Sequence, residues 1–215
     1  MRAVCCHVSM VLPAFRLLAA AASLALFAAC TGRKAATILP DGCRLKAGDV
    51  VFRLGNGLTS RAVLMADGGG TYSHVGIVVD SCGTMMIVHA VPGEPDYEGD
   101  PDRVKMETPE KFFISVNASK GEVRRFRGDP AVAEAAARCA LSLYERGVLF
   151  DHDYDDADTT KMYCCELVEH SYRSAGRPLV GGARHSFSLP GLKPMRCILP
   201  SDLRGSDELE LIVSF

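Results

Sequence analysis

Short apolar and β-branched runs, bounded by glycine and polar residues, recur along the chain and predict β-strands. Residues 80–83 separate two such runs as a turn, so the strands on either side of it form a hairpin. The last run alternates strictly between apolar and polar positions, which is the period of a strand with one solvated face. In chain order, the expected strands cover residues 50–53, 74–80, 84–90, 122–127, 148–155 and 209–215.

The clearest predicted helix follows the expected strand at 122–127 and has recognisable ends. Asp129 is placed as its N-cap, an alanine-rich body runs to Arg146, and Gly147 stops it. An apolar stripe at helical spacing is expected to pack in the core; its members are Ala131, Ala135, Cys139 and Leu143.

Two further helices are predicted. Residues 55–66 place Leu58, Ala62 and Met65 on one side of a helix, and residues 164–175 form another, ended by Gly176. In the latter, we expect Glu166 to serve the helix N-terminus and Glu169 to form a surface pair with Arg173. Antiparallel strands mixed with helices predict an α+β fold, in which a central antiparallel sheet packs against helices.

Residues 1–29 have the features of a signal peptide. Arg2 and Arg16 are the only fixed charges there, and residues 17–29 are all apolar or small. As a helix this run would span about 20 Å, too short for the ~30 Å hydrocarbon core of a bilayer. A permanent transmembrane span is therefore not expected.

The end of this run resembles the lipobox of bacterial lipoproteins. Ala28 and Ala29 precede Cys30, although Phe27 stands where leucine is more usual. The resemblance implies a lipid on Cys30 and a membrane anchor in the cell envelope, at the periplasmic side or the surface. The alternative is ordinary cleavage nearby and a soluble exported product. Residues 30–44 are then a tether, and 45–215 form one domain of ordinary size.

Composition narrows the range of partners and cofactors. A formal net charge of -2 makes neither nucleic acid nor an acidic membrane surface an obvious partner. Seven cysteines remain beyond Cys5 and Cys6, an odd number without regular spacing, so a disulfide framework is not expected. There is no Cys-x-x-Cys, His-Glu-x-x-His or phosphate-binding glycine loop, and we expect no metal and no cofactor.

The chemistry is expected at Cys164, the first residue of the helix at 164–175. A thiol reacts as its thiolate, and the free N–H groups and dipole of a helix start stabilise that thiolate. Cys165 is turned about 100° away by the helical period and is expected to pack instead. A buried, inert Cys164 is the plain alternative.

Two histidines can supply the base that a cysteine nucleophile needs. If Asp80 pairs with Gly83, His74 lies directly opposite His89 on one face of the hairpin, and a slip of two residues would leave both on that face. His74 would then accept the thiol proton while His89 orients its ring. For His89, a satisfied core histidine is the alternative, and His152 is the other histidine that could line the cleft.

The motifs around these residues resemble a known family. Tyr72-Ser73-His74-Val75-Gly76 and Tyr163-Cys164-Cys165-Glu166-Leu167, with Gly48-Asp49 before them and His89 between them, are similar to the circularly permuted NlpC/P60 branch of the papain-like superfamily. This branch contains the YiiX/YebB-like cysteine hydrolases, relatives of the lecithin retinol acyltransferase group. Cys165 departs from the usual serine or threonine. The resemblance implies a circularly permuted papain-like fold with Cys164 as nucleophile.

These features together predict an exported cysteine hydrolase. Its site would be Cys164, His74 and His89, and it would cleave an amide bond through a thioester. The resemblance implies a cell-wall peptide or an N-acyl compound as substrate. Two alternatives stay open: a thiol acyltransferase that passes the acyl group to a lipid or amine, and a non-catalytic surface lipoprotein that keeps the fold for binding.

Overall fold

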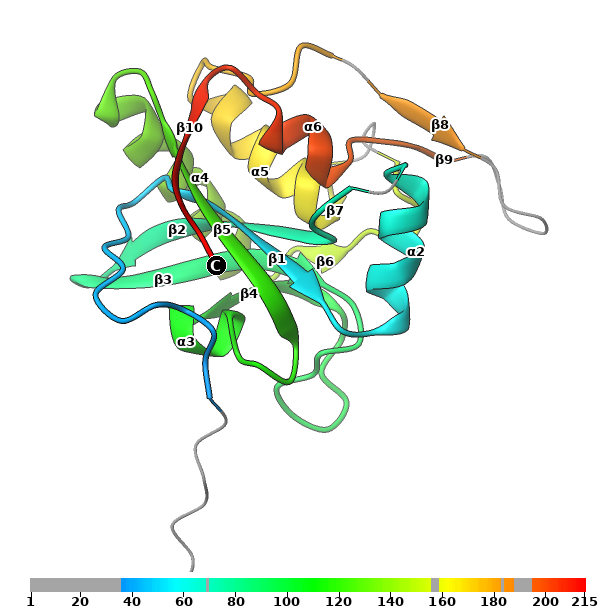
Figure 1. Ribbon diagram of the computed structural model, residues 1–215. Helices are drawn as coiled ribbons and strands as arrows, with labels where there is room; N and C mark the ends of the chain where they lie inside the picture. Colours follow the sequence, from blue (N-terminus) through cyan, green and yellow to red (C-terminus); the bar gives the residue numbers. More distant parts are fainter. Residues whose placement is uncertain (1–35, 69, 156–158, 183, 188–194) are drawn as a thin grey trace, which may run out of the picture. The chain divides into compact units, whose positions relative to one another are not determined.

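The computed structural model describes residues 36–68, 70–155, 159–182, 184–187 and 195–215 (Figure 1). The expected signal peptide and Cys30 lie outside these residues. Within the described residues, no helix combines the length and the apolar character that a membrane crossing requires.

An eight-stranded sheet forms the centre of the domain, in the order β10-β5-β1-β2-β3-β4-β6-β7. All neighbours in it are antiparallel except β6 and β7. The prediction of an α+β fold with a central antiparallel sheet is confirmed. The strands are β1 (Val50–Gly55), β2 (His74–Ser81), β3 (Thr84–Val91), β4 (Arg103–Glu107), β5 (Ala118–Phe126), β6 (Leu149–Phe150), β7 (Lys161–Met162) and β10 (Leu209–Ser214), with β8 (His185–Phe187) and β9 (Met195–Cys197) forming a separate hairpin.

The helices cover the two faces of this sheet unequally (Figure 1). One face packs against α4 (Pro130–Glu145) and α5 (Cys164–Ser174), and Val75, Ile77 and Val79 of β2 belong to the core there. The other face meets the short helix α3 (Pro109–Phe112), where Val78 and Phe112 share a smaller core. The remaining helices are α2 (Leu58–Ala66) and α6 (Pro200–Arg204).

Gly48 and Asp49 tie the first strand to both layers. Gly48 has φ +88, and a Cβ there would come within 2.7 Å of the Ala133 carbonyl oxygen, so the turn requires glycine. The Tyr172 hydroxyl of α5 donates to the Gly48 carbonyl. The buried Asp49 carboxylate accepts from the Lys46 backbone N–H and, at 2.7 Å, from the Arg125 guanidinium.

Two predicted helix faces differ from the structure. In α4 only Leu143 of the expected stripe is buried, and the buried face is made by Ala133, Ala136, Ala137, Ala140 and Leu143. In an alanine-rich helix, i,i+4 stripes exist on several faces, so the pattern alone does not select one. In α2 no residue is buried, and Leu58 and Met65 are each 82% exposed.

Four other segments also differ from the sequence-based expectations. The predicted strand at 148–155 is reduced to Leu149–Phe150, with an isolated bridge at Asp155. The strand β4 was not predicted because charged residues alternate along it. The helix α3 was not predicted because it has only four residues. Thr37 and Ile38, which the sequence places in the tether, bond to the Phe113 carbonyl beside α3.

Glu169 was expected in a surface pair, but its side chain is buried. Its Oε2 accepts from the backbone N–H groups of Leu179 and Val180 at 2.9 and 3.0 Å, while Oε1 accepts from Arg173 at 2.8 Å. The expectation failed because the sequence shows Arg173 as an i,i+4 partner but does not show the two backbone N–H donors of Leu179 and Val180. Glu169 therefore fixes the chain that leaves α5.

We expect Glu169→Ala to lower the free energy of unfolding by about 2–4 kcal/mol, because two buried N–H groups lose their acceptor. Urea unfolding followed by circular dichroism measures this change. Glu134→Ala is the matched control, since Glu134 and Arg138 form an exposed i,i+4 pair 3.8 Å apart. That control should change stability by less than about 0.5 kcal/mol, and an equal loss in both variants would contradict the role given to Glu169.

Candidate active site

The hairpin that carries the two histidines has a register shifted by two residues from the simple expectation. Asp80 pairs with Met85 and Ile77 with Val88, because Cys82 and Gly83 both have positive φ and form the turn themselves. The pairing of Asp80 with Gly83 is therefore wrong. An even shift keeps side chains on their faces, so both histidines still point to the side of α3.

His74 and His89 are in direct contact. Nε2 of His74 lies 2.9 Å from Nδ1 of His89, with the rings edge to face. Both side chains are buried, and the ring of Phe112 packs against each of them. Gly76 makes room for this pair, because a Cβ there would come within 2.8 Å of Ile87 and 3.2 Å of the His89 Cβ.

Burial lowers the pKa of both rings. For His74 the Arg53 guanidinium adds to this effect, and the pKa falls well below its ordinary value. For His89 the Glu107 carboxylate opposes burial, but the pKa is still lowered. Both rings are therefore neutral near pH 7, which is the state in which His74 can accept a proton.

Cys164 begins α5 next to the start of β2. The backbone N–H of Val75, the residue after His74, points at its sulfur, as do the N–H groups of Cys164 and Cys165. The Cys165 thiol, 3.9 Å away, lowers the pKa of the Cys164 thiol most, and these N–H groups add to its effect against that of burial. The sulfur is turned to Cys165, and no hydrogen bond joins it to the His74 ring among these described residues.

Cys165 occupies a different environment from its neighbour. It is 1% exposed and packs in the core beneath α5 with Leu167 and Val168. Burial and the neighbouring Cys164 raise the pKa of its thiol well above the ordinary value. An inaccessible, protonated thiol is a poor nucleophile.

Glu166 serves the N-terminus of α5, as expected from the sequence, since its carboxylate accepts from the Tyr163 backbone N–H at 3.4 Å.

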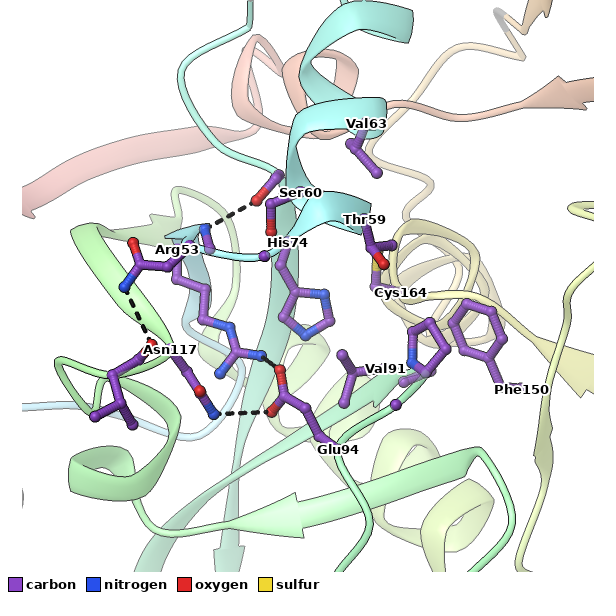
Figure 2. A pocket seen from close by; sticks show the side chains of 18 of the residues that line it. Arg53, Thr59, Ser60, Val63, His74, Val91, Glu94, Asn117, Phe150 and Cys164 are labelled. Atoms are coloured by element: carbon purple, nitrogen blue, oxygen red, sulfur yellow. Dashed lines mark hydrogen bonds and ion pairs between the residues drawn. The ribbon is translucent and has the colours of Figure 1, made fainter. Parts of the chain in front are cut away.

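Cys164 and His74 line one pocket of about 430 Å³ (Figure 2). Thr59, Ser60 and Val63 of α2 form one wall, and Val91, Phe150 and Tyr154 supply apolar surface. The polar end holds Arg53, Glu94 and Asn117, where the Arg53 guanidinium donates to Glu94 at 2.5 Å and Asn117 lies 3.4 Å from the same carboxylate. Such a pocket accepts a substrate with both an apolar and a polar part.

Two residues beside this site were not singled out from the sequence. Glu107, at the end of β4, places Oε2 3.3 Å from Nε2 of His89. In the described part of the chain, no aligned hydrogen bond reaches that ring nitrogen, so the contact with Glu107 is a close approach of the two groups. Tyr154 lines the pocket with φ +53, a left-handed conformation unusual for a side chain of this size. His152, the other histidine considered for the cleft, is 64% exposed and pairs with Asp102.

Comparison with known proteins identifies the fold. No protein-family model matches the sequence, and no curated protein matches it. The structure is similar to the crystal structure of the metalloprotein YiiX from Escherichia coli O157:H7, DUF1105, with a TM-score of 0.65. The similarity covers 80% of this chain and 99% of that one. This chain has the YiiX fold. The two sequences are 18% identical, so the likeness confirms the expected YiiX-like resemblance at the level of the fold.

The description of YiiX as a metalloprotein raises the question of a metal site here. Among the described residues, no group of three or more His, Cys, Asp and Glu side chains is placed to hold a metal ion. His74 and His89 instead direct ring nitrogens at each other. The described residues therefore do not fit a metal centre.

The buried rings predict that the protein loses stability in acid. Histidines in the unfolded chain gain protons as the pH falls through about 6.5, whereas His74 and His89 in the folded protein resist protonation, so the unfolded state is favoured. Glu107 acts in the same direction at lower pH. Burial raises its pKa, but the contacts with His89 and Lys111 outweigh burial and lower it to about 2.

We expect the melting temperature to fall as the pH drops below about 6.5, and to fall further below about pH 4.5. Differential scanning calorimetry between pH 8 and pH 3.5 measures this change. In a His74→Gln/His89→Gln variant the first decline should become shallower. If the melting temperature of the wild type stays constant between pH 7 and pH 5, His74 and His89 are not buried in the neutral form.

Proposed function

We propose that this protein is a cysteine hydrolase that cleaves an amide bond through Cys164, His74 and His89. The observation that carries the proposal is the shared pocket, in which a thiol of lowered pKa at a helix start lies beside a neutral histidine held by a second histidine. Perturbed pKa values in a cleft are typical of catalytic groups. The finer architecture we propose is the circularly permuted papain-like one, supported by the order His74, His89, Cys164 along the chain.

The reaction would proceed in two steps. The thiol proton of Cys164 passes to His74, the thiolate attacks the amide carbonyl, and the imidazolium returns the proton to the leaving amine. This leaves a thioester on Cys164. A water molecule, deprotonated by His74, then attacks the thioester, releasing the carboxylic acid and restoring the thiol. The proton transfer requires a rotamer of Cys164 in which the sulfur faces the His74 ring instead of Cys165.

The tetrahedral intermediate needs donors for its oxyanion. The backbone N–H of Cys164 at the start of α5 supplies one, because that group has no partner within the helix. The sequence alone assigns no second donor. The Tyr154 hydroxyl is the candidate for this role, since its side chain lines the same pocket as Cys164.

An acyltransferase is the second function that the pocket supports. The apolar surface of Val91, Phe150 and Tyr154 suits an acyl group. Hydrolysis and transfer share the thioester and differ only in the group that attacks it. Substrates in both cases would be N-acyl compounds or cell-wall peptides in the cell envelope, with the protein held at a membrane through a lipid on Cys30.

The test is incubation of the protein with a panel of muropeptides and N-acyl lipids, followed by mass spectrometry. One arm uses protein blocked beforehand with iodoacetamide, and another adds a primary amine as acceptor. New masses that disappear after alkylation support a thiol-dependent enzyme, and acyl transfer to the amine identifies the transferase. A thiol that reacts with iodoacetamide near neutral pH no faster than free cysteine would contradict an activated Cys164 and favour a non-catalytic binding protein.

A further inference from the structure

A continuous line of contacts runs from the pair of histidines through Glu107 to the partly exposed Lys111. Nε2 of His74 faces Nδ1 of His89 at 2.9 Å, and Nε2 of His89 faces Oε2 of Glu107 at 3.3 Å. The other oxygen of Glu107 contacts Nζ of Lys111 at 2.8 Å. Lys111 follows Glu107 by four residues because β4 leads directly into α3.

The charge of Glu107 determines which groups in this line donate. An ionised carboxylate can only accept, so the Nε2 of His89 that faces it must carry a proton. A neutral ring has one N–H, and Nδ1 of His89 is then the acceptor. His74 must therefore donate from Nε2, and its Nδ1 is left with a lone pair.

We propose that Glu107 is a positioning residue that fixes the tautomers of His89 and His74 and so leaves Nδ1 of His74 as the base for Cys164. The inference deepens the proposed function and rests on it for the role of the thiol. In the reaction, the S–H proton moves to Nδ1 of His74, giving a thiolate and a ring protonated on both nitrogens. The Nε2–H that already faces His89 stays in place.

Lys111 fixes the orientation of Glu107. Its ammonium group can only donate, and besides Oε1 of Glu107 it contacts Asp96 at 2.7 Å. The other cationic groups near the rings form their ion pairs with other carboxylates. Arg53 of β1 lies over the Phe112 ring and pairs with Glu94, and Lys105 of β4 pairs with Asp96 and Asp100. Glu107 is thus the carboxylate that faces His89 in the described part of the chain.

The ring tautomers can be observed directly by NMR. Long-range ¹H–¹⁵N spectra of protein labelled with ¹⁵N-histidine distinguish Nδ1–H from Nε2–H rings, assigned here with His74→Gln and His89→Gln variants. We expect both rings of the wild type to be Nε2–H near pH 7. An Nδ1–H tautomer on either ring of the wild type would overturn the proposal, and this result needs no variant at position 107 to fold.

Glu107→Gln gives the sharper contrast. Lys111 should hold the amide oxygen, so the amide NH₂ faces His89 and reverses the line of donors. Both rings then become Nδ1–H, and His74 presents a proton to the thiol in place of a lone pair. We expect the rate of hydrolysis to fall about a hundredfold or more, because a wrong histidine tautomer causes losses of at least this size in other triads. Alkylation of Cys164 near pH 7 should also slow.

A second substitution tests whether Lys111 sets this orientation. In Glu107→Gln/Lys111→Met the amide is free to turn its oxygen to His89, and activity should recover at least tenfold over Glu107→Gln. A simple structural role for Glu107 predicts further loss in the double variant, which would overturn the proposal. Glu110→Gln, an exposed neighbour in α3, is the control and should match the wild type.

The two proposals fail in different ways. If the wild type cleaves nothing in the substrate panel but its rings are both Nε2–H and reverse in Glu107→Gln, the tautomer assignment stands and the hydrolase proposal fails. If substrate is cleaved through Cys164 but Glu107→Gln leaves the rings and the rate unchanged, the role of Glu107 is wrong and the hydrolase proposal stands.

Discussion

Replacing Cys164 with alanine should abolish cleavage, with a loss of about 10⁴-fold or more in the rate of product formation. The thiolate forms the covalent intermediate, and no other described nucleophile of lowered pKa lines the pocket to replace it. Product formation from the active member of the substrate panel, followed by mass spectrometry, measures the loss. The variant should retain the fold of the wild type, because Cys164 lies at the edge of the core.

Cys165→Ser is the matched control for this experiment. It keeps a hydrogen-bond donor beside Cys164 while removing the only neighbouring thiol in the helix. We expect its activity to stay within about tenfold of the wild type, because one neutral hydrogen bond contributes about 1 kcal/mol. If Cys165→Ser is inactive and Cys164→Ala is active, the nucleophile has been assigned to the wrong cysteine.

His74→Gln should reduce cleavage by about 10²–10⁴-fold, the range that a general base contributes. The thiol of Cys164 would then lose its proton only to solvent. We therefore expect the pH profile of iodoacetamide alkylation, followed by intact mass spectrometry, to move to higher pH. In the wild type, the lowered pKa of His74 should keep the acidic limb of the activity profile below pH 6.5.

His152→Gln is the control for His74, because it removes a histidine of the same region that is 64% exposed and does not line the pocket. It should leave both the rate and the alkylation profile unchanged. If the two variants lose cleavage rate equally, the loss is a general effect of removing an imidazole near the site. His74 would then have no specific role as the base.

The sequence correctly predicted that the two histidines lie on one face of the hairpin, although the predicted register was wrong. The turn uses Cys82 and Gly83 in left-handed conformations, so the pairing moved by two residues from the one expected. Side chains alternate with a period of two, and an even shift leaves His74 and His89 together. The placement of Cys164 at a helix start was equally predictable, because Gly176 and the apolar spacing define that helix.

Glu107 could not have been found in the same way. Arg103, Lys105 and Glu107 alternate with apolar residues, a pattern typical of a solvated strand face, yet Lys105 and Glu107 are buried. Their burial comes from α3 and the loop around Asp96, which cover that face and supply ion pairs. Tertiary contacts of this kind leave no periodic signal in a single sequence.

The helix α2 gives the two sides of the pocket different freedom to change. It buries none of its residues, yet Thr59, Ser60 and Val63 form one wall of the cavity. Substitutions on this wall would cost little unfolding free energy, whereas His74, which also lines the pocket, is buried in the sheet. Substitutions on α2 can therefore change which compounds such a protein accepts, while the reacting groups stay in place.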